Sequence, residues 1–159
     1  MMTWTDEQVI DGLNLRLVAS ENGILRILFR APGPPEGRYE REQPLLVEAA
    51  RQLRAYFAGA LREFQLPLDL RGTDFQLRVW RRLLTIPYGE TRSYSDIARA
   101  LKAPGSVRAV GAANGANPIP ILVPCHRVIG AGGKLVGYGG GIALKKRLLD
   151  LEREAPLFR

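Results

Sequence analysis

The segment best suited to chemistry is residues 119–128, where an apolar run bounded by prolines delivers Cys125 next to His126 and Arg127. A nearby cation lowers the pKa of a thiol, and the thiolate is the nucleophilic form. The arrangement therefore predicts a nucleophilic cysteine, although a lone cysteine is more often an inert buried residue. Adjacent side chains of an extended chain point opposite ways, so we expect His126 to reach the thiol through backbone curvature or a water.

Other polar residues near this segment carry no catalytic signal on their own. Asn114 and Asn117 are typical turn residues, and Glu152 is typical of a solvated helix end. The glycine-rich stretch 129–141 contains neither of the two common phosphate-binding glycine patterns. With a single cysteine and a single histidine, the chain cannot form an internal disulfide or a four-ligand zinc site of Cys and His.

Composition places the chain among globular proteins. Its 159 residues are 46% hydrophobic and 25% charged, which excludes disorder, collagen and coiled coil. No run approaches the roughly 20 apolar residues of a membrane span, and the first residues lack the pattern of a signal peptide. We expect a cytoplasmic protein that needs no metal or other cofactor and does not bind membranes.

Charge is distributed unevenly along the chain. Residues 1–70 hold eight Arg and no Lys against ten acidic residues, a net charge of about −2. Residues 71–159 hold fifteen Lys and Arg against six acidic residues, about +9. Such asymmetry indicates that the second part faces a polyanion, most often nucleic acid, although a basic surface without a partner is about as common.

The first part has the pattern of a small α+β unit. Two alternating apolar runs within residues 13–29 flank Asn22-Gly23, a strong hairpin signal. From Pro44 to about Ala58, apolar residues recur at helical spacing and predict an amphipathic helix. Residues 66–73 then have the composition of a linker.

The second part is mostly helical. Thr73 and Gln76 form a capping-box pattern that opens a helix ended by Pro87-Tyr88-Gly89. Two short helices, opening at Ser93 and spanning 106–113, flank a Pro-Gly turn and predict a helix-turn-helix. A last helix from about 141 to 152 is expected to direct its leucines inward and Lys145, Lys146 and Arg147 outward.

These segments together resemble one protein family. The run NPIPILVPCHRVIG is similar to the signature of the O6-alkylguanine-DNA alkyltransferases, also called methylated-DNA–protein-cysteine methyltransferases. The similarity extends through FQLRVWRRLLTIPYGETRSYSDIA, VRAVGAANGANP and GYGGGIALKKRLLDLE, and covers about residues 68–152. It implies a ribonuclease-H-like N-terminal α/β domain over 1–68. A winged helix-turn-helix-like domain that carries the active cysteine would follow over 69–159.

The resemblance also implies roles for individual residues. Cys125 would accept the alkyl group, and His126 would take the thiol proton through a water, oriented and charged by Glu152. Asn117 would brace the turn, and Tyr94 would donate a proton to the leaving guanine. Arg108 would enter the duplex stack as a finger. The other implied DNA contacts are Tyr94, Ser95, Ala109, Ala112, Ala113 and Arg127. The implied base pocket comprises Tyr94, Pro120, Val128, Tyr138, Gly139 and Gly140.

The chemistry explains why such residues are needed. An alkyl carbon on guanine O6 is attacked in line, so the site needs a soft nucleophile and a proton donor to the leaving base. The nucleotide must first leave the duplex, at a cost of a few kcal/mol. The expected reaction is DNA repair by a single transfer from O6-alkylguanine, and less well from O4-alkylthymine, in double-stranded DNA. We expect a monomer in solution, and cooperative assembly on DNA stays open.

Two other functions compete with this interpretation. A Cys-His hydrolase would use Cys125 as acyl nucleophile and Asn117 as orienter, but it leaves the helix-turn-helix without a purpose. A non-catalytic module that binds alkylated bases fits the helix-turn-helix, but it has no need for Cys125.

Overall fold

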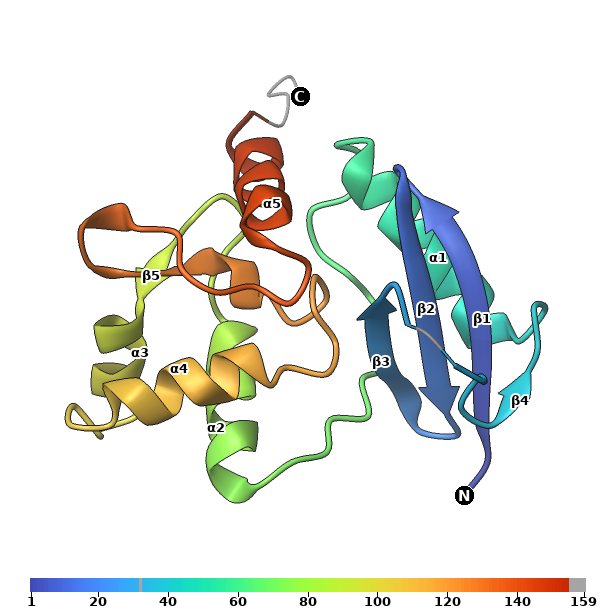
Figure 1. The fold of residues 1–159 in the computed structure, drawn as a ribbon, viewed down its shortest axis with the longest axis horizontal. Coiled ribbons are helices and arrows are strands. Elements are labelled where there is room, and N and C mark those ends of the chain that lie inside the picture. Colours follow the sequence, from blue (N-terminus) through green and yellow to red (C-terminus); the bar gives the residue numbers. More distant parts are fainter. Residues whose placement is uncertain (32, 155–159) are drawn as a thin grey trace. The chain divides into compact units, whose positions relative to one another are not determined.

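The computed structural model describes residues 1–31 and 33–154, which divide into two compact units at Arg71 and Gly72. The architecture is α+β, as predicted: a sheet with one helix in the first unit and mostly helices in the second (Figure 1).

The first unit is built on a four-stranded sheet of order β3-β2-β1-β4. The predicted hairpin is confirmed as β2 (Leu13–Ser20) and β3 (Gly23–Phe29), which pair antiparallel. Strand β1 (Thr3–Ile10) pairs antiparallel with β2, and the short β4 (Arg38–Tyr39) pairs parallel with β1. The sequence did not predict β1, because four consecutive polar residues, 5–8, interrupt its apolar alternation.

Helix α1 (Pro44–Phe57) lies against one face of this sheet and matches the predicted helix (Figure 1). Its buried side chains include Leu46, Leu53 and Tyr56, each with 0% exposure. Successive strand residues point to opposite faces, so Leu15 and Leu17, both buried, share one face of β2. This apolar layer forms the core of the first unit.

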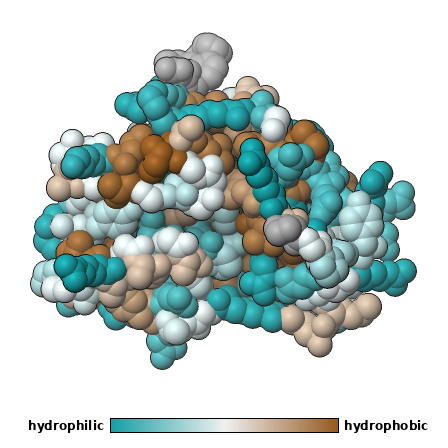
Figure 2. Space-filling view, in the orientation of Figure 1, coloured by the Kyte–Doolittle hydropathy of each residue, from teal (hydrophilic) through white to brown (hydrophobic). Residues whose placement is uncertain are grey.

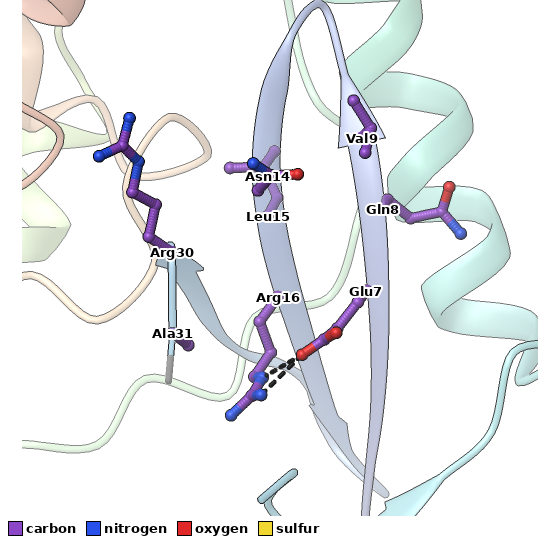
Figure 3. A pocket seen from close by; sticks show the side chains of 8 residues that line it. All are labelled: Glu7, Gln8, Val9, Asn14, Leu15, Arg16, Arg30 and Ala31. Carbon is purple, nitrogen blue, oxygen red and sulfur yellow. Dashed lines mark hydrogen bonds and ion pairs between the residues drawn. The ribbon is translucent and has the colours of Figure 1, made fainter. Parts of the chain in front are cut away.

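The opposite face of β2 carries a buried arginine. Arg16 reaches across to Glu7 on β1 with two hydrogen bonds to Oε1, of 3.0 Å from Nε and 2.6 Å from Nη2 (Figure 3). Its guanidinium also donates to the carbonyls of Gly33 and Pro34. These bonds attach the loop after β3 to the sheet. Arg16 and Glu7 also line a pocket together with Arg30.

The segment predicted as a linker is partly tied to the sheet. Ile24 at the start of β3 donates to the carbonyl of Pro67 and accepts from the amide of Asp69, both at 2.8 Å. Gly23 has a φ of +153°, and a Cβ there would lie 2.6 Å from the Pro67 carbonyl oxygen. Only glycine leaves room for this close approach.

The second unit contains the helices that the sequence predicted. They are α2 (Asp74–Leu83), α3 (Tyr94–Ala100), α4 (Val107–Gly115) and α5 (Ile142–Glu154). Between them lie a 3-10 turn, η1 (Cys125–Arg127), a second 3-10 turn, η2 (Ala131–Gly133), and a parallel pairing of β5 (Arg92–Ser93) with β6 (Val128–Ile129).

Helices α2, α3 and α4 pack against one another around Val79, Leu83, Ile97 and Val110, all buried. The indole Nε1 of Trp80 on α2 donates to the carbonyl of Ala113 on α4 at 2.8 Å. This buried hydrogen bond fixes the position of α4 relative to α2.

One predicted side-chain direction is wrong. Lys145 was expected to face outward with Lys146 and Arg147, but it has 0% exposure, whereas its two neighbours are exposed. Lys145 lies three residues before Leu148 and seven before Glu152, so all three share the buried stripe of α5. The ammonium group finds a backbone partner there, described below.

Hydrophilic side chains cover most of the face seen in Figure 2. No helix among the described residues is long and apolar enough to cross a bilayer.

Two helix starts give a matched test of capping. Ser93 caps α3 by accepting from the amide of Asp96 at 3.0 Å, and Asp96 accepts from the Ser93 amide at 2.8 Å. Ser106 begins α4 without any side-chain capping bond. We expect Ser93→Ala to lower the free energy of unfolding by about 1 kcal/mol and Ser106→Ala to change it little. Urea denaturation without DNA measures both, and equal losses would contradict this assignment.

Candidate active site

Cys125 opens the short turn η1, which the preceding loop holds in place. The amide of Asn117 donates from Nδ2 to the carbonyl of Val123 at 2.8 Å and accepts at Oδ1 from the amide of Ile119 at 2.9 Å. Asn117 therefore closes the loop that leads to the cysteine. Ile121 within it has a φ of 76°, which costs a β-branched residue on the order of 1–3 kcal/mol and persists only where surrounding contacts enforce it.

The turn conformation changes the expected relation of Cys125 to its neighbours. The sequence suggested an extended chain, but residues 125–127 form a 3-10 helix, whose successive side chains point about 120° apart. His126 and Arg127 therefore project away from the thiol. Both are directed to one carboxylate on α5.

That carboxylate is Glu152, which is 5% exposed and accepts hydrogen bonds from the His126 ring, the Arg127 guanidinium and the Gly89 amide. His126 Nε2 lies 2.7 Å from Oε2, and Arg127 donates from Nε to Oε1 at 2.8 Å and from Nη2 to Oε2 at 3.0 Å. The amide of Gly89 approaches Oε1 at 3.4 Å. These bonds outweigh the effect of burial and lower the pKa of Glu152 to about 2. Glu152 is therefore a buried anion, not a solvated helix end.

Arg127 was predicted to contact DNA, and the structure corrects this. Its side chain is buried, pairs with Glu152, and donates from Nη1 to the carbonyl of Ile86 at 2.8 Å. The guanidinium also lies 5.7 Å from the centre of the Tyr88 ring. A guanidinium bound to these partners fastens α5 to the segment that follows α2.

His126 is neutral at ordinary pH. It has 0% exposure, and burial lowers its pKa below the usual 6.5 even though Glu152 acts to raise it. The ionised carboxylate can only accept, so Nε2 must carry the proton of the neutral ring. Nδ1 is then an acceptor, and it is buried without a hydrogen-bond partner among the described residues. The imidazole is thus held in the tautomer that can take a proton at Nδ1.

The Cys125 thiol is 5% exposed, and burial raises its pKa. A hydrogen bond with the Asn117 side chain and the charge of Lys145 act in the opposite direction. This corrects the expectation that the flanking cation lowers the pKa, because the Arg127 charge is already paired with Glu152.

Two tyrosines interact electrostatically with the thiol. Burial and the charge of a Cys125 thiolate raise the pKa of Tyr94, and the same two causes, with Glu152, raise that of Tyr138 well above 10.0. Both phenols therefore keep their protons and can act as donors. The Tyr94 hydroxyl donates to the carbonyl of Val136 at 3.4 Å.

The remaining predicted pocket residues differ in exposure. Pro120 and Val128 are buried beside the 3-10 turn, whereas Gly139 is exposed and Gly140 partly so. The structure thus joins His126 to Glu152 by a hydrogen bond, and Asn117 to Cys125 by a hydrogen bond with the thiol. Tyr94 and Tyr138 act electrostatically on the same thiol.

Helix α4 presents a slim outer face. Arg108, Ala109 and Ala112 are exposed, and Arg108 has no side-chain partner among the described residues. Ala113, another implied DNA contact, is only 3% exposed, and its carbonyl accepts from the Trp80 indole on α2. Ser95 is half-buried in the first turn of α3.

Sequence reasoning missed two buried residues of the site. Asn114 donates from Nδ2 to the carbonyl of Cys125 at 3.3 Å, and Lys145 acts electrostatically on the thiol. Both had a detectable signal in their helical spacing. Asn114 lies four residues after Val110 on the buried face of α4, and Lys145 lies three residues before the buried Leu148 on α5. The described residues contain no group of three His, Cys, Asp or Glu side chains suited to a metal ion.

Comparison with known families accounts for both units. Residues 14–70 match the ribonuclease-like domain of 6-O-methylguanine DNA methyltransferase, and residues 74–154 match its DNA-binding domain. The two matches cover the sheet unit and the helical unit separately.

Individual proteins support the same relationship. The methylated-DNA–protein-cysteine methyltransferase of Mycobacterium bovis is 60% identical over 81% of this chain and 78% of its own length. The crystal structure of Mycobacterium tuberculosis O6-methylguanine methyltransferase has a TM-score of 0.89 at 49% identity, covering 98% of this chain and 95% of that one. A structure of the same M. tuberculosis protein in complex with DNA has a TM-score of 0.85 at 51% identity, covering 99% and 96%. The chain belongs to the methylated-DNA–protein-cysteine methyltransferase family.

Proposed function

We propose that this protein repairs DNA by moving the alkyl group of O6-alkylguanine onto Cys125, once per molecule. One observation next to Cys125 carries the proposal. The neutral ring of His126 is hydrogen-bonded to the ionised Glu152 and has an unprotonated Nδ1 without a partner among the described residues. Membership of the family supplies the substrate class. We expect the protein to act as a monomer in the cytoplasm, where a single thiol stays reduced.

The proton of the thiol has a defined route in this proposal. His126 accepts it at Nδ1 through a bridging water, since the thiol and the ring project in different directions from the 3-10 turn. The resulting imidazolium is stabilised by Glu152, whose charge is fixed in place by Arg127. A base that is neutral before the reaction and charged during it gives the differential stabilisation that catalysis requires.

The transfer itself is one displacement. The sulfur forms a bond to the alkyl carbon while the bond from that carbon to O6 breaks, and guanine leaves with the electron pair. The negative charge that develops on the leaving base is stabilised by a hydrogen bond from Tyr94, the proposed donor, whose raised pKa keeps the phenol protonated, and the released base then takes its proton from water. Pro120, Val128, Tyr138, Gly139 and Gly140 would line the base pocket.

Helix α4 would bring the base to this site. Its small exposed residues allow close approach to a groove, and Arg108 is a long, unpaired cation on that face. We propose that Arg108 fills the space left in the stack when the nucleotide flips out. The thioether product has no good leaving group, so the thiol is not regenerated.

Transfer should be stoichiometric. Incubation with a duplex that contains O6-methylguanine is expected to raise the intact mass by about 14 Da, the mass of a methyl group replacing a proton, and to place it on Cys125. Activity should stop after one equivalent. Cys125→Ser should bind DNA and transfer nothing. Release of many methyl groups per protein would contradict the proposal and favour a hydrolase.

Glu152→Gln tests the proton route. Without the carboxylate, His126 is a weaker base and its tautomer is no longer enforced, so transfer should slow by at least tenfold, with its pH–rate profile shifted upward. DNA affinity should change little. Asp150→Asn, on the exposed side of the same helix, is the matched control. A profile that is unchanged in Glu152→Gln would leave the carboxylate with a structural role alone.

Arg108→Ala separates base flipping from chemistry. If Arg108 offsets part of the cost of flipping, its loss should slow transfer from duplex DNA far more than transfer from free O6-alkylguanine base. Arg108→Lys should rescue only partly, because lysine lacks the planar guanidinium that can stack. Arg81→Ala, which removes an exposed arginine of α2, should cost only affinity, at most one phosphate contact in the salt dependence. Equal losses on both substrates would place Arg108 in the chemistry or the fold.

A further inference from the structure

Lys145 is a buried cation that the proton route does not use. It has 0% exposure, whereas the adjacent Lys146 is exposed and pairs with Asp150 at 2.7 Å. Lysine is almost never fully buried unless it is paired, because desolvation of an ammonium group is costly. A negatively charged partner is therefore expected near the Lys145 ammonium.

The hydrogen bonds of Lys145 do not supply that partner. Its Nζ donates to the carbonyl of Val136 at 3.0 Å and lies 6.0 Å from the centre of the Tyr94 ring. It forms no ion pair with a carboxylate among the described residues. Lys145 also stands in the first turn of α5, where its own amide bonds to Gly141. The helix dipole disfavours a cation at that end.

Among the described residues, the charges around Lys145 leave one candidate anion. Glu152, the buried carboxylate of the site, is already paired with Arg127. His126 is neutral, and Lys145 acts to lower its pKa further. Cys125 is the group whose negative charge acts to raise the pKa of Lys145, and Lys145 acts in turn to lower the pKa of Cys125.

We propose that Lys145 is the counter-charge of the Cys125 thiolate. His126 and Glu152 determine where the thiol proton goes, and the ammonium of Lys145 stabilises the charge that is left on sulfur. Burial disfavours both charges separately, so each depends on the other inside the site. The charge on sulfur disappears when its bond to the alkyl carbon forms and guanine leaves with the electron pair. The inference rests on the proposed function only in taking Cys125 as the nucleophile.

The remaining titratable groups that face the thiol do not compete for this role. Tyr94 and Tyr138 both have raised pKa values, so they stay uncharged at pH 7, and a phenol cannot supply a positive charge. Asn117 lowers the pKa of the thiol by a hydrogen bond but carries no charge. Among the described residues that act on Cys125, Lys145 is thus the cation.

The test is the pH dependence of the reaction of Cys125 with iodoacetamide, measured on the full chain without DNA. Cys125 is the only cysteine, so the rate reports one thiol. Lys145→Met and Lys145→Gln should raise the apparent pKa of the thiol by about one unit and slow the reaction at pH 7 about tenfold. Gln keeps a donor for the Val136 carbonyl, which separates the charge from the hydrogen bond.

Two further variants serve as controls. Lys145→Arg keeps the charge and should give a pH profile close to that of the unmodified protein. Lys146→Met removes the same charge from the exposed side of α5 and should leave the profile unchanged. A profile unaltered by Lys145→Met and Lys145→Gln would overturn the proposal. An equal shift in Lys145→Arg, or in Lys146→Met, would overturn it too, because the effect would then be one of packing or of general charge.

A measurement on the unmodified protein covers the case in which the neutral variants fail to fold. The ¹³Cε resonance of Lys145 reports its own ionisation before and after Cys125 is alkylated with iodoacetamide. Loss of the thiolate should lower the pKa of Lys145 by about one unit, and an unchanged pKa would overturn the proposal. Neither experiment uses alkylated DNA, so a failure of alkyl transfer would not be mistaken for a failure of this inference.

Discussion

The structure of the active site depends on one buried interaction, the carboxylate of Glu152 shared between His126 and Arg127. Breaking such a pair is expensive, because the partner that remains is a buried charge without compensation. The interaction therefore fixes the end of α5 against the 3-10 turn that carries Cys125. Through the bond from Arg127 to the Ile86 carbonyl, it also fixes that turn against the segment after α2. The apolar core of the second unit positions the helices, and this ion pair determines their register at the site.

The same interaction explains how charge is divided around the thiol. Because Arg127 is paired with Glu152, it contributes little to the ionisation of Cys125, although it is only two residues away. Because Glu152 is ionised and can only accept, His126 must present Nδ1 as a base. In the proposed mechanism, the neutral base takes the thiol proton and the ammonium of Lys145 stabilises the negative charge, so the two have separate partners. The phenols of Tyr94 and Tyr138 have raised pKa values, so they stay protonated and can donate hydrogen bonds.

Local sequence signals predicted most of the fold. Asn22-Gly23 located the hairpin, and the capping pairs of Thr73 with Gln76 and of Ser93 with Asp96 located two helix starts, because these signals act within a few residues. What local reasoning could not provide was the partner of each buried polar group. Arg127 looked like a surface cation and Lys145 like a solvated one, since only the tertiary structure brings Glu152 beside Arg127 and the Val136 carbonyl beside Lys145. The strand β1 was missed for a similar reason, because its pairing with β2 overrides a weak alternation.

The central claim is that Glu152 holds His126 as a neutral base with its proton on Nε2. His126 is the only histidine of the chain, so ¹⁵N labelling of histidine gives the signals of one ring. At pH 7, without DNA, we predict the ¹⁵N shifts of a neutral imidazole, with the proton on Nε2 and an unprotonated Nδ1. This pattern should persist below pH 6.5, because burial lowers the pKa of the ring. A doubly protonated ring at pH 7, or a neutral ring with its proton on Nδ1, would contradict the account.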